Sequence, residues 1–376
     1  MRHHNYGTDF DFVVPPVKFN KYTEKSLLQY CLGATLYMPG TKKIVNKILE
    51  KQLPGLTSMV MCFEDAIQEK DLSAAESNVL EHLAVISKAL KEEIICHDDI
   101  PLTFLRVRTV DQFESFVKRL THDTADVLTG FVFPKFYSEN AFKYYDILTR
   151  LNRELNVNLY AMPILEGTQI AYLETRLDEL KKLQLVFRSY PQQTLNIRIG
   201  GTDFSSIFGM RRGINYSVYD ILPVRDCLSD ILNFFNRQDD DFIISAPVWE
   251  YFLADKKENL ADRLGEDIHR SLLKRHTIVN EAIDGLMREV ILDKANGFVG
   301  KTIIHPSHLR YVNAMQAATR EEYEDSCQIL QTEGGVVKGT NKMNEINPHR
   351  NWALKIANRA KAFGVIENEA SYYRMF

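Results

Sequence analysis

The hydrophobic positions of this chain follow two alternating patterns. Short apolar runs, six to nine residues long, have the length and composition of buried strands. Longer stretches between them carry apolar residues at the i, i+3 and i+4 spacing of amphipathic helices. The expected strands cover residues 33–38, 58–64, 102–108, 130–135, 158–165, 194–200, 241–248 and 297–305. The expected helices between and after them cover residues 42–53, 71–93, 111–120, 141–155, 171–184, 219–236 and 275–295.

This alternation predicts the fold class. Strands that are buried on both faces and separated by helices form parallel sheets. Eight such units predict an α/β chain that closes into a (β/α)8 barrel, the TIM-barrel architecture. An open doubly wound sheet stays as the alternative, although the first expected strand lacks the GxGxxG signature of dinucleotide-binding sheets.

The two ends of the chain depart from the repeat. Residues 1–26 contain a proline pair and no helical period, which indicates an irregular N-terminal arm. The barrel is expected over residues 27–310. Residues 311–376 are too few for an independent domain, so we expect a C-terminal helical extension that forms a lid or a contact between subunits. In and beside it, helical patterns cover residues 306–316, 320–330 and 351–363, and a glycine-rich polar loop covers residues 332–350.

Composition and charge narrow the class of protein. The chain has 376 residues, a net charge of −4 and 45% hydrophobic residues, which is ordinary for a globular protein. The acidic balance argues against nucleic acid or an anionic membrane as the main partner. The five cysteines are widely spaced and form no CxxC pair, which argues against a disulfide framework and a structural zinc site. Because the N-terminus has no apolar signal core and no run could span a membrane, we expect a cytoplasmic protein.

Two acids follow neighbouring strands. Glu166 comes directly after the run 158–165, and Asp203 follows the next strand behind Gly200 and Gly201. In a barrel, the carboxyl ends of the strands share one mouth, so both acids would face it. Two close carboxylates repel unless a cation joins them, and a pair with open coordination positions suits Mg²⁺. The alternative is that Asp203 caps the following helix.

Further ionisable residues end other expected strands and are predicted at the same rim. Arg106 and Arg108 would share one strand face, where they could grip a substrate carboxylate or stabilise an enolate. Each residue also has a purely structural interpretation. The acids could cap helices, the arginines could form structural ion pairs, the lysine could be solvated, and the histidine could occupy a core position. The residues are Glu64, Asp65, Arg106, Arg108, Lys135 and His305.

Several of these residues lie in short segments whose order along the chain matches that of a known family. The segments are TLYMPGTKK, MVMCFEDAI, FLRVRT, FVFPKF, PILEGTQI, GGTDFSSIFGMRR and TIIHPSHL. Together they resemble the citrate lyase β-subunit-like branch of the hydroxy-acid aldolase superfamily, in a divergent bacterial form, from about residue 33 to about residue 362. The resemblance implies a TIM barrel and a carbon–carbon bond lyase or aldolase.

The resemblance also implies roles for individual residues. Glu166 and Asp203 match the family's Mg²⁺ ligands. Arg106 matches the arginine that holds the carbonyl or enolate oxygen of the substrate, and Glu64 with Asp65 matches the acidic pair that orders water and arginine near the metal. The positions expected to contact substrate are Arg106, Arg108, Lys135, Gly201 and Thr202.

The C-terminal segment departs from the family pattern. Where the family has Met-x-Asp-x-Pro, this chain has KMNEINPH, which places Glu345 at the position of the aspartate that acts as base or acid, in some members on a neighbouring subunit. One extra residue separates Glu345 from Pro348. Arg108 stands where many members carry Asn, and Thr202 stands where an acid usually falls.

The expected function is therefore a Mg²⁺-dependent lyase or aldolase that cleaves a 2-oxo or 3-hydroxy acid through an enolate. A CoA thioester is kept open as the substrate carrier, and family members imply a homo-oligomer, a trimer or larger. Two alternatives remain. One is a malate synthase-like enzyme that runs the chemistry in the condensing direction, and the other is a non-catalytic barrel that binds a metabolite or a partner protein.

Overall fold

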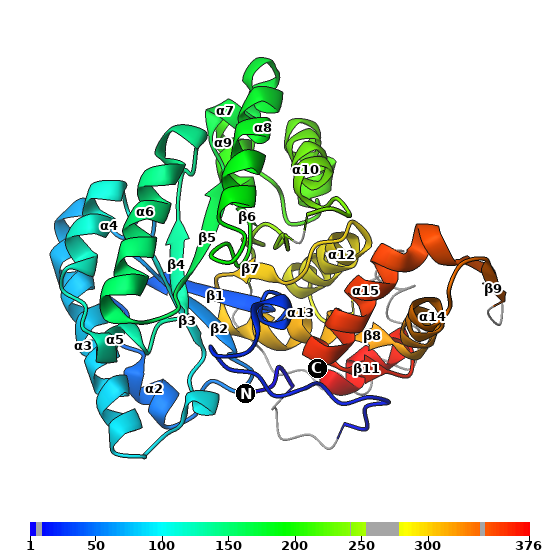
Figure 1. Cartoon of the computed structure of the whole chain (residues 1–376), viewed down its shortest axis with the longest axis horizontal. Helices are drawn as coiled ribbons and strands as arrows, with labels where there is room; N and C mark the ends of the chain where they lie inside the picture. Colours follow the sequence, from blue (N-terminus) through cyan, green and yellow to red (C-terminus); the bar gives the residue numbers. More distant parts are fainter. Residues whose placement is uncertain (5–9, 241, 253–277, 339–342) are drawn as a thin grey trace.

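A curled parallel sheet forms the centre of the molecule (Figure 1). The computed structural model describes residues 1–4, 10–240, 242–252, 278–338 and 343–376. Within this part, seven strands pair in parallel in the order β6-β5-β4-β3-β2-β1-β7. They are β1 (Ala34–Pro39), β2 (Ser58–Cys62), β3 (Leu102–Arg106), β4 (Gly130–Phe133), β5 (Tyr160–Leu165), β6 (Arg198–Ile199) and β7 (Lys301–Ile303).

The gap between β6 and β7 is closed by residues 242–248, from the run 241–248 in which a strand is expected. Isolated parallel bridges join Ile197 to Ile244 and Ala246 to Lys301. The Ile197 N–H donates to the Ile243 carbonyl at 2.9 Å, and the Thr302 N–H donates to the Ala246 carbonyl at 3.2 Å. This segment makes isolated bridges and no continuous strand, but its hydrogen bonds to both neighbours complete a closed barrel. The TIM-barrel prediction is confirmed, and the open doubly wound alternative is wrong.

Helices surround the barrel between successive strands (Figure 1). Thr109 begins α4 because its hydroxyl accepts the Gln112 N–H, and Asn280 begins α12 because its side chain accepts the Ile283 N–H. The first residues of the predicted helix 275–295 lie outside the described residues. The helices are α1 (Lys25–Leu28), α2 (Val45–Leu49), α3 (Leu72–Lys91), α4 (Val110–Val117), α5 (His122–Ala125), α6 (Ser138–Leu155), α7 (Thr168–Ala171), α8 (Leu173–Ser189), α9 (Gly201–Ile207), α10 (Leu222–Phe235), α12 (Glu281–Ala295) and α13 (Leu309–Met315).

Aromatic packing joins these helices to the sheet. Phe113 of α4 lies 4.8 Å from Phe131 of β4, measured between ring centroids. On the same strand, Phe133 stacks on Tyr144 of α6 at 4.4 Å. All four side chains are buried, so the apolar positions of the amphipathic helices cover the outer face of the strands as their spacing predicts.

The C-terminal extension contains two long helices, α14 (Arg320–Gln331) and α15 (Ile346–Phe363). The prediction of an irregular loop over residues 332–350 is wrong in part. Strands β9 (Val336–Lys338) and β10 (Met343–Glu345) form an antiparallel pair, and α15 begins five residues before the predicted start at 351. Ile346 explains the earlier start, because it is buried against Ile329 of α14 and anchors the first turn.

The N-terminal residues pack on this extension. Val14 bridges to Val365, which belongs to β11 (Val365–Ile366), and β11 pairs in parallel with β8 (Ala318–Thr319). The two chain ends also lie near one another in Figure 1. Among the described residues, none of the helices is both long enough and apolar enough to cross a lipid bilayer. All five cysteines are free thiols.

Candidate active site

The two predicted metal ligands meet at the carboxyl ends of β5 and β6. These strands pair in register, with Leu165 opposite Ile199, so the residues that follow them emerge side by side. Gly200 lies between the two acids. A Cβ atom at this glycine would lie 2.4 Å from the Cβ of Glu166 and 2.8 Å from Oδ2 of Asp203. The close approach of the two carboxylates therefore requires a residue without a side chain at position 200.

Asp203 is not a helix cap. It lies in the first turn of α9, and the N-cap of that helix is Gly200, which has no side-chain cap hydrogen bond. The carboxyl of Asp203 instead faces Glu166, the charges of the two acids act on each other, and burial raises the pKa of Asp203. The capping alternative is therefore wrong for Asp203.

Glu166 carries the most perturbed carboxyl group of the cluster. It is 3% exposed, and burial raises its pKa to about 8. The Arg106 guanidinium opposes this rise, whereas the negative charge of Asp203 adds to it. At neutral pH, the site thus holds one of its two acids largely protonated, and a cation would remove that conflict.

Arg106, at the end of β3, joins acids that follow two other strands, β2 and β5. It is the last residue of β3 and is buried. Its Nη2 atom forms an ion pair with Glu64, lies 3.0 Å from Oδ2 of Asp65 and lies 3.5 Å from Oε1 of Glu166. The prediction that strand ends would bring these four residues to one rim is borne out by the geometry, and Arg106 is at the centre of the group.

Lys135 completes the cluster from β4. It has a positive φ of 45°, which turns the chain sharply after Pro134. Its backbone N–H donates to Oε1 of Glu166 at 2.7 Å, and its Nζ forms an ion pair with Glu64. The side chain is half-exposed but does not extend into solvent alone, contrary to the purely solvated alternative. Lys135 therefore fixes the orientation of two acids at once.

The acidic pair after β2 has unequal charge states. Burial raises the pKa of Glu64, even though Arg106 lies against it. Burial alone would also raise the pKa of Asp65, but its hydrogen bond with Glu64 and the charge of Arg106 outweigh burial and lower it. Asp65 is thus the carboxylate of this pair that stays ionised most readily.

Three other predicted residues make contacts outside the cluster. Arg108 donates from Nη1 to the Phe63 carbonyl at 3.0 Å, and the strand ends at Arg106, so the alternation that would place both arginines together does not continue. Gly201 is buried, and a Cβ atom there would lie 2.9 Å from Pro247. His305 stacks on Phe252 at 4.6 Å and bonds to Ser307. Within the described part of the chain, neither Arg108 nor His305 forms an ion pair with the acids.

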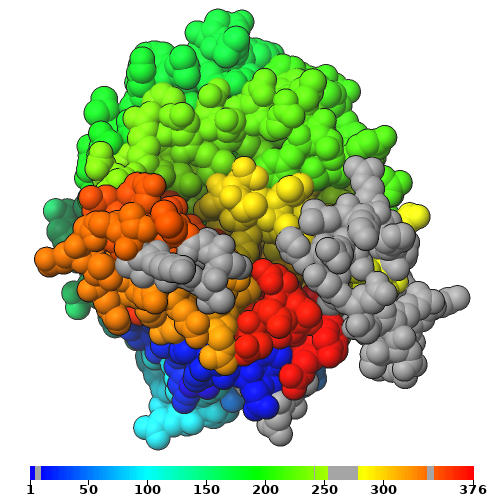
Figure 2. Space-filling model, turned by 90° about the vertical axis from the view of Figure 1, so that its right-hand side faces the viewer, coloured from blue at the N-terminus to red at the C-terminus, as the bar shows by residue number. Residues whose placement is uncertain are grey.

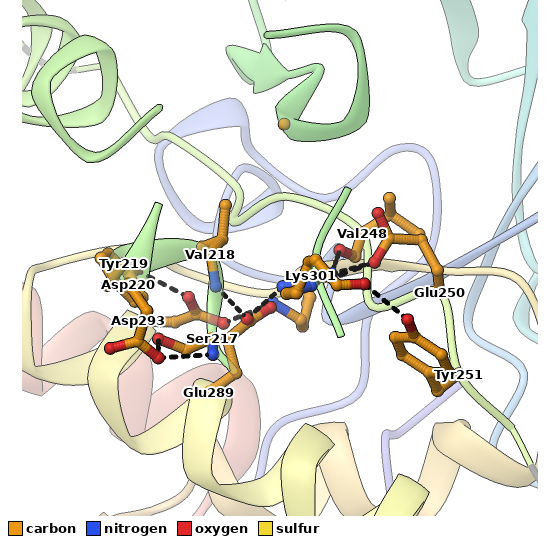
Figure 3. A network of polar contacts seen from close by, with 12 residues as sticks. Ser217, Val218, Tyr219, Asp220, Val248, Glu250, Tyr251, Glu289, Asp293 and Lys301 are labelled. Carbon is orange, nitrogen blue, oxygen red and sulfur yellow. Dashed lines mark hydrogen bonds and ion pairs between the residues drawn. The ribbon is translucent and has the colours of Figure 1, made fainter. Parts of the chain in front are cut away.

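Thr202 leads to a buried charge network that the sequence did not predict (Figure 3). Its hydroxyl donates to Glu250 at 2.7 Å, and Glu250 pairs with Arg212, which also pairs with Glu289. Lys301 lies 2.8 Å from both Glu289 and Asp293, and Tyr219 donates to Asp293 at 2.7 Å. Two features of the sequence indicate such a network: a lysine at the start of an apolar strand, and two acids spaced i, i+4 on the preceding helix. The network ties α9, which carries Asp203, to α12 and β7.

Glu345 lies apart from the cluster. It is the exposed last residue of β10 and the N-cap of α15. The strand with which it pairs, β9, lies at the outer right edge of Figure 1, away from the ends of β5 and β6. A single chain as described does not bring Glu345 to the other predicted residues, and its catalytic role stays a prediction.

One further buried cation faces the barrel interior. Arg198 of β6 is 1% exposed, donates to the Thr302 hydroxyl at 2.6 Å and lies 5.4 Å from the ring of Tyr37. The sequence signal was an arginine inside the apolar run TLNIRIG. Its position links β6, β7 and β1 across the barrel.

The residues present fit a magnesium ion. The described residues contain no group of three or more His, Cys, Asp or Glu side chains arranged to hold a metal, so the candidate site is a pair of carboxylates. Magnesium is commonly held by one or two carboxylates, while water and substrate complete its coordination. Gly200 allows the two acids to come within reach of one cation, and burial keeps the pKa of Glu166 raised even though Arg106 lies beside it.

Comparison with known proteins identifies the family. No protein of curated function matches the sequence. Among solved structures, the chain is similar to CitE from Mycobacterium tuberculosis in complex with magnesium, acetoacetate and coenzyme A, with 16% identity, a TM-score of 0.52, and coverage of 87% of this chain and 97% of that one. It is also similar to the magnesium/glyoxylate complex of Haloferax volcanii malate synthase, with 11% identity, a TM-score of 0.50, and coverage of 87% and 88%.

These likenesses show the fold alone, because the identities are low. The sequence itself matches a family model over residues 26–365, which includes every strand of the barrel and both acids of the candidate site. The chain therefore belongs to the family of carbon–carbon bond lyases of the TIM-barrel fold.

Proposed function

We propose that this protein is a Mg²⁺-dependent carbon–carbon lyase that cleaves a 2-oxo or 3-hydroxy acid through an enolate. The observation that carries the proposal is the contact of Glu166 and Asp203 beside Arg106 at the carboxyl ends of the strands. Catalytic groups of TIM barrels occur at this end. Family membership supports the class of reaction, and the pair of acids supports the cation.

Each residue of the cluster has a role in this proposal. Glu166 and Asp203 would hold Mg²⁺, which when bound would supply positive charge to the carboxylate and oxo or hydroxy oxygen of the substrate. Arg106 presents a fixed positive charge where an enolate oxygen would develop. Glu64 and Asp65 hold the Arg106 guanidinium in place, and Lys135 holds both Glu64 and Glu166.

The proton transfer is assigned to the C-terminal segment. Glu345 would supply or accept the proton, from a second copy of the chain, since the described chain leaves it exposed and away from its own cluster. We include in the proposal a homo-oligomer in which the β9–β10 pair reaches a neighbouring mouth. A CoA thioester as substrate carrier belongs to the same proposal, and CitE, a structure similar in fold, was solved with coenzyme A.

The condensing direction is the second candidate. It would join a 2-oxo acid to the enolate of a thioester at the same cation, and the fold similarity to a malate synthase favours it. Incubation with glyoxylate and acetyl-CoA separates the two directions: malate formation supports condensation, whereas cleavage of a longer hydroxy acid supports the lyase.

Calorimetric titration of Mg²⁺ tests the proposal first. We expect Mg²⁺ to bind the wild-type protein, to bind more tightly with pyruvate, oxaloacetate or glyoxylate present, and to lose this coupling in Asp203→Asn. Asp178→Asn, an exposed acid on α8, is the matched control and should keep the coupling. If wild type binds no Mg²⁺, or if Asp203→Asn binds it equally well, the assigned metal site is wrong.

Activity then tests the reaction. Glu166→Gln and Asp203→Asn should each abolish Mg²⁺-dependent cleavage across a panel of hydroxy and oxo acids, while circular dichroism shows a retained fold. Binding of an acid without turnover by wild type would instead support the non-catalytic barrel.

A further inference from the structure

A second cavity lies at the opposite end of the barrel from the carboxylate cluster. It has a volume of about 300 Å³ and is lined in part by Gly297 and Val299, which precede β7. The acids of the cluster, in contrast, follow the ends of their strands. The remaining walls come from the end of α12, from α13, α14 and α15, and from the 3-10 helix η6 (Glu369–Met375). Figure 2 shows the face on which the yellow segment that contains α12 meets the orange and red C-terminal segments.

The charged lining is not balanced evenly. Lys294, Lys355 and Arg359 contribute positive charge, and Glu322 and Glu369 contribute negative charge. Lys294 and Glu322 compensate each other: the ammonium lies 3.3 Å from the carboxylate and also donates to the Ala317 carbonyl at 3.0 Å. Glu369 is on the exposed rim. Lys355 is only partly buried and donates to the side chain of Asn236, so the most deeply buried positive charge of the lining is that of Arg359.

Arg359 has an incomplete set of partners in the described part of the chain. It is 7% exposed, and the one hydrogen bond found for it there is from Nη2 to the Phe298 carbonyl at 3.1 Å. Glu322 acts on it through its charge, but no described carboxylate comes within ion-pair distance. A guanidinium carries five N–H donors in a planar fork that fits a carboxylate or phosphate. A buried charge without a partner is costly, so an anion bound here would be strongly favoured.

The other walls are apolar and aromatic. Trp352 is 36% exposed and lies on the same helix as Arg359, seven residues earlier, so both point to the same side of α15. Ile291, Met315 and Tyr372 face the cavity from other elements. A ligand in this cavity could therefore place an anionic group at Arg359 and pack the apolar remainder of the molecule against Trp352. A volume of about 300 Å³ is at the small end of ligand pockets.

We propose that this cavity binds a small organic anion with one carboxylate or phosphate head and an apolar body, at a site separate from the Glu166–Asp203 cluster. The cavity lies at the amino end of β7, away from the carboxyl ends where TIM barrels carry their catalytic groups, so we assign to it binding and not turnover. Recognition would come from the Arg359 fork at the head and from Trp352 at the body.

Titration with benzoate and with phenyl phosphate tests the proposal and distinguishes the two head groups. Binding is followed by calorimetry and by tryptophan fluorescence, since Trp352 lies in the cavity wall while Trp249 is buried elsewhere. We expect saturable one-to-one binding of at least one anion. Benzyl alcohol, which lacks the charge, should bind at least about tenfold more weakly than that anion. Inorganic phosphate lacks the phenyl group of phenyl phosphate, so the difference in affinity between the two measures the contribution of the apolar part.

Variants locate the binding. Arg359→Gln should weaken binding about tenfold or more, whereas Lys361→Gln, an exposed residue on the same helix, should leave it unchanged. Asp203→Asn should also leave it unchanged. If Arg359→Gln does not fold, Trp352→Ala decides, because the half-exposed tryptophan can be removed without emptying the core, and it should lose both binding and the fluorescence response.

Three results would overturn the proposal. One is the absence of saturable binding of either anion to the wild-type protein. Another is a folded Arg359→Gln, or Trp352→Ala, that binds as tightly as wild type. The third is loss of binding in Asp203→Asn, which would place the anion at the candidate active site instead.

Discussion

Replacing Glu166 with glutamine removes a carboxyl group that the fold keeps in an unfavourable environment. Burial raises its pKa from 4.5 to about 8, so the folded chain prefers the protonated form while the unfolded chain ionises at a lower pH. The contribution of the protonated Glu166 to the free energy of unfolding is fully present below pH 4.5 and is lost as the pH rises to about 8. At about 1.4 kcal/mol for each pH unit, the loss reaches about 3 kcal/mol at pH 7 and about 5 kcal/mol above pH 8. Glutamine can still accept the Lys135 N–H and carries no charge.

The assay is urea unfolding of wild type and Glu166→Gln from pH 5 to 9 with a chelator present. We expect the variant to gain stability over wild type progressively across this range, by the amounts given above. Glu139→Gln, an exposed acid on α6, serves as the control and should follow wild type. Adding Mg²⁺ at pH 8 should stabilise wild type, because the cation replaces the proton, and should leave Glu166→Gln unchanged. A difference between variant and wild type that does not vary with pH would refute the reasoning.

Three further changes test the geometry of the cluster and of the charge network. Gly200→Ala places a Cβ atom 2.4 Å from Glu166 and should weaken Mg²⁺ binding about tenfold or more by calorimetry, whereas Gly213→Ala, with its nearest contact at 3.4 Å, should not. Lys301→Met leaves Glu289 with less positive charge in a fully buried site and should cost about 3–5 kcal/mol in urea unfolding; a cost under about 1 kcal/mol would contradict the network. Arg106→Lys should weaken the binding of pyruvate to the Mg²⁺-loaded protein about tenfold, measured by calorimetry, while Mg²⁺ alone still binds.

The closed barrel explains why so much of the site could be predicted from the sequence. Apolar runs of strand length separated by amphipathic helices leave few arrangements other than a parallel barrel, and seven of the eight expected strands form. Once the strands are parallel and closed, their carboxyl ends share one rim. Glu166, Arg106 and Lys135, from different strands, then meet without any further information from the sequence.

Predictions failed where local pattern does not determine structure. The run 241–248 is as apolar as the other strands, yet its described residues make only isolated bridges, because pairing depends on both neighbours and not on the run itself. Arg108 was placed beside Arg106 by strand alternation, which stops when the strand stops. The glycine content of the segment after α14 predicts a loop, but Val336 and Val337 have enough β propensity to pair with β10.

The buried network of Figure 3 shows what a sequence cannot supply. Lys301 interrupts an apolar strand, and Glu289 lies with Asp284 and Asp293 among the buried positions of α12, so the sequence at each element indicates a buried charge. Neither indicates its partner: Arg212, in the segment that follows α9, and Glu289, on α12, are 77 residues apart and meet only in the folded barrel. Arg359 is also a buried charge, but among the described residues no carboxylate lies within ion-pair distance of it, and Glu322 acts on it only from farther away. Because a buried charge without an ion-pair partner is costly, the anion proposed for the second cavity would relieve a cost that the chain itself leaves at Arg359.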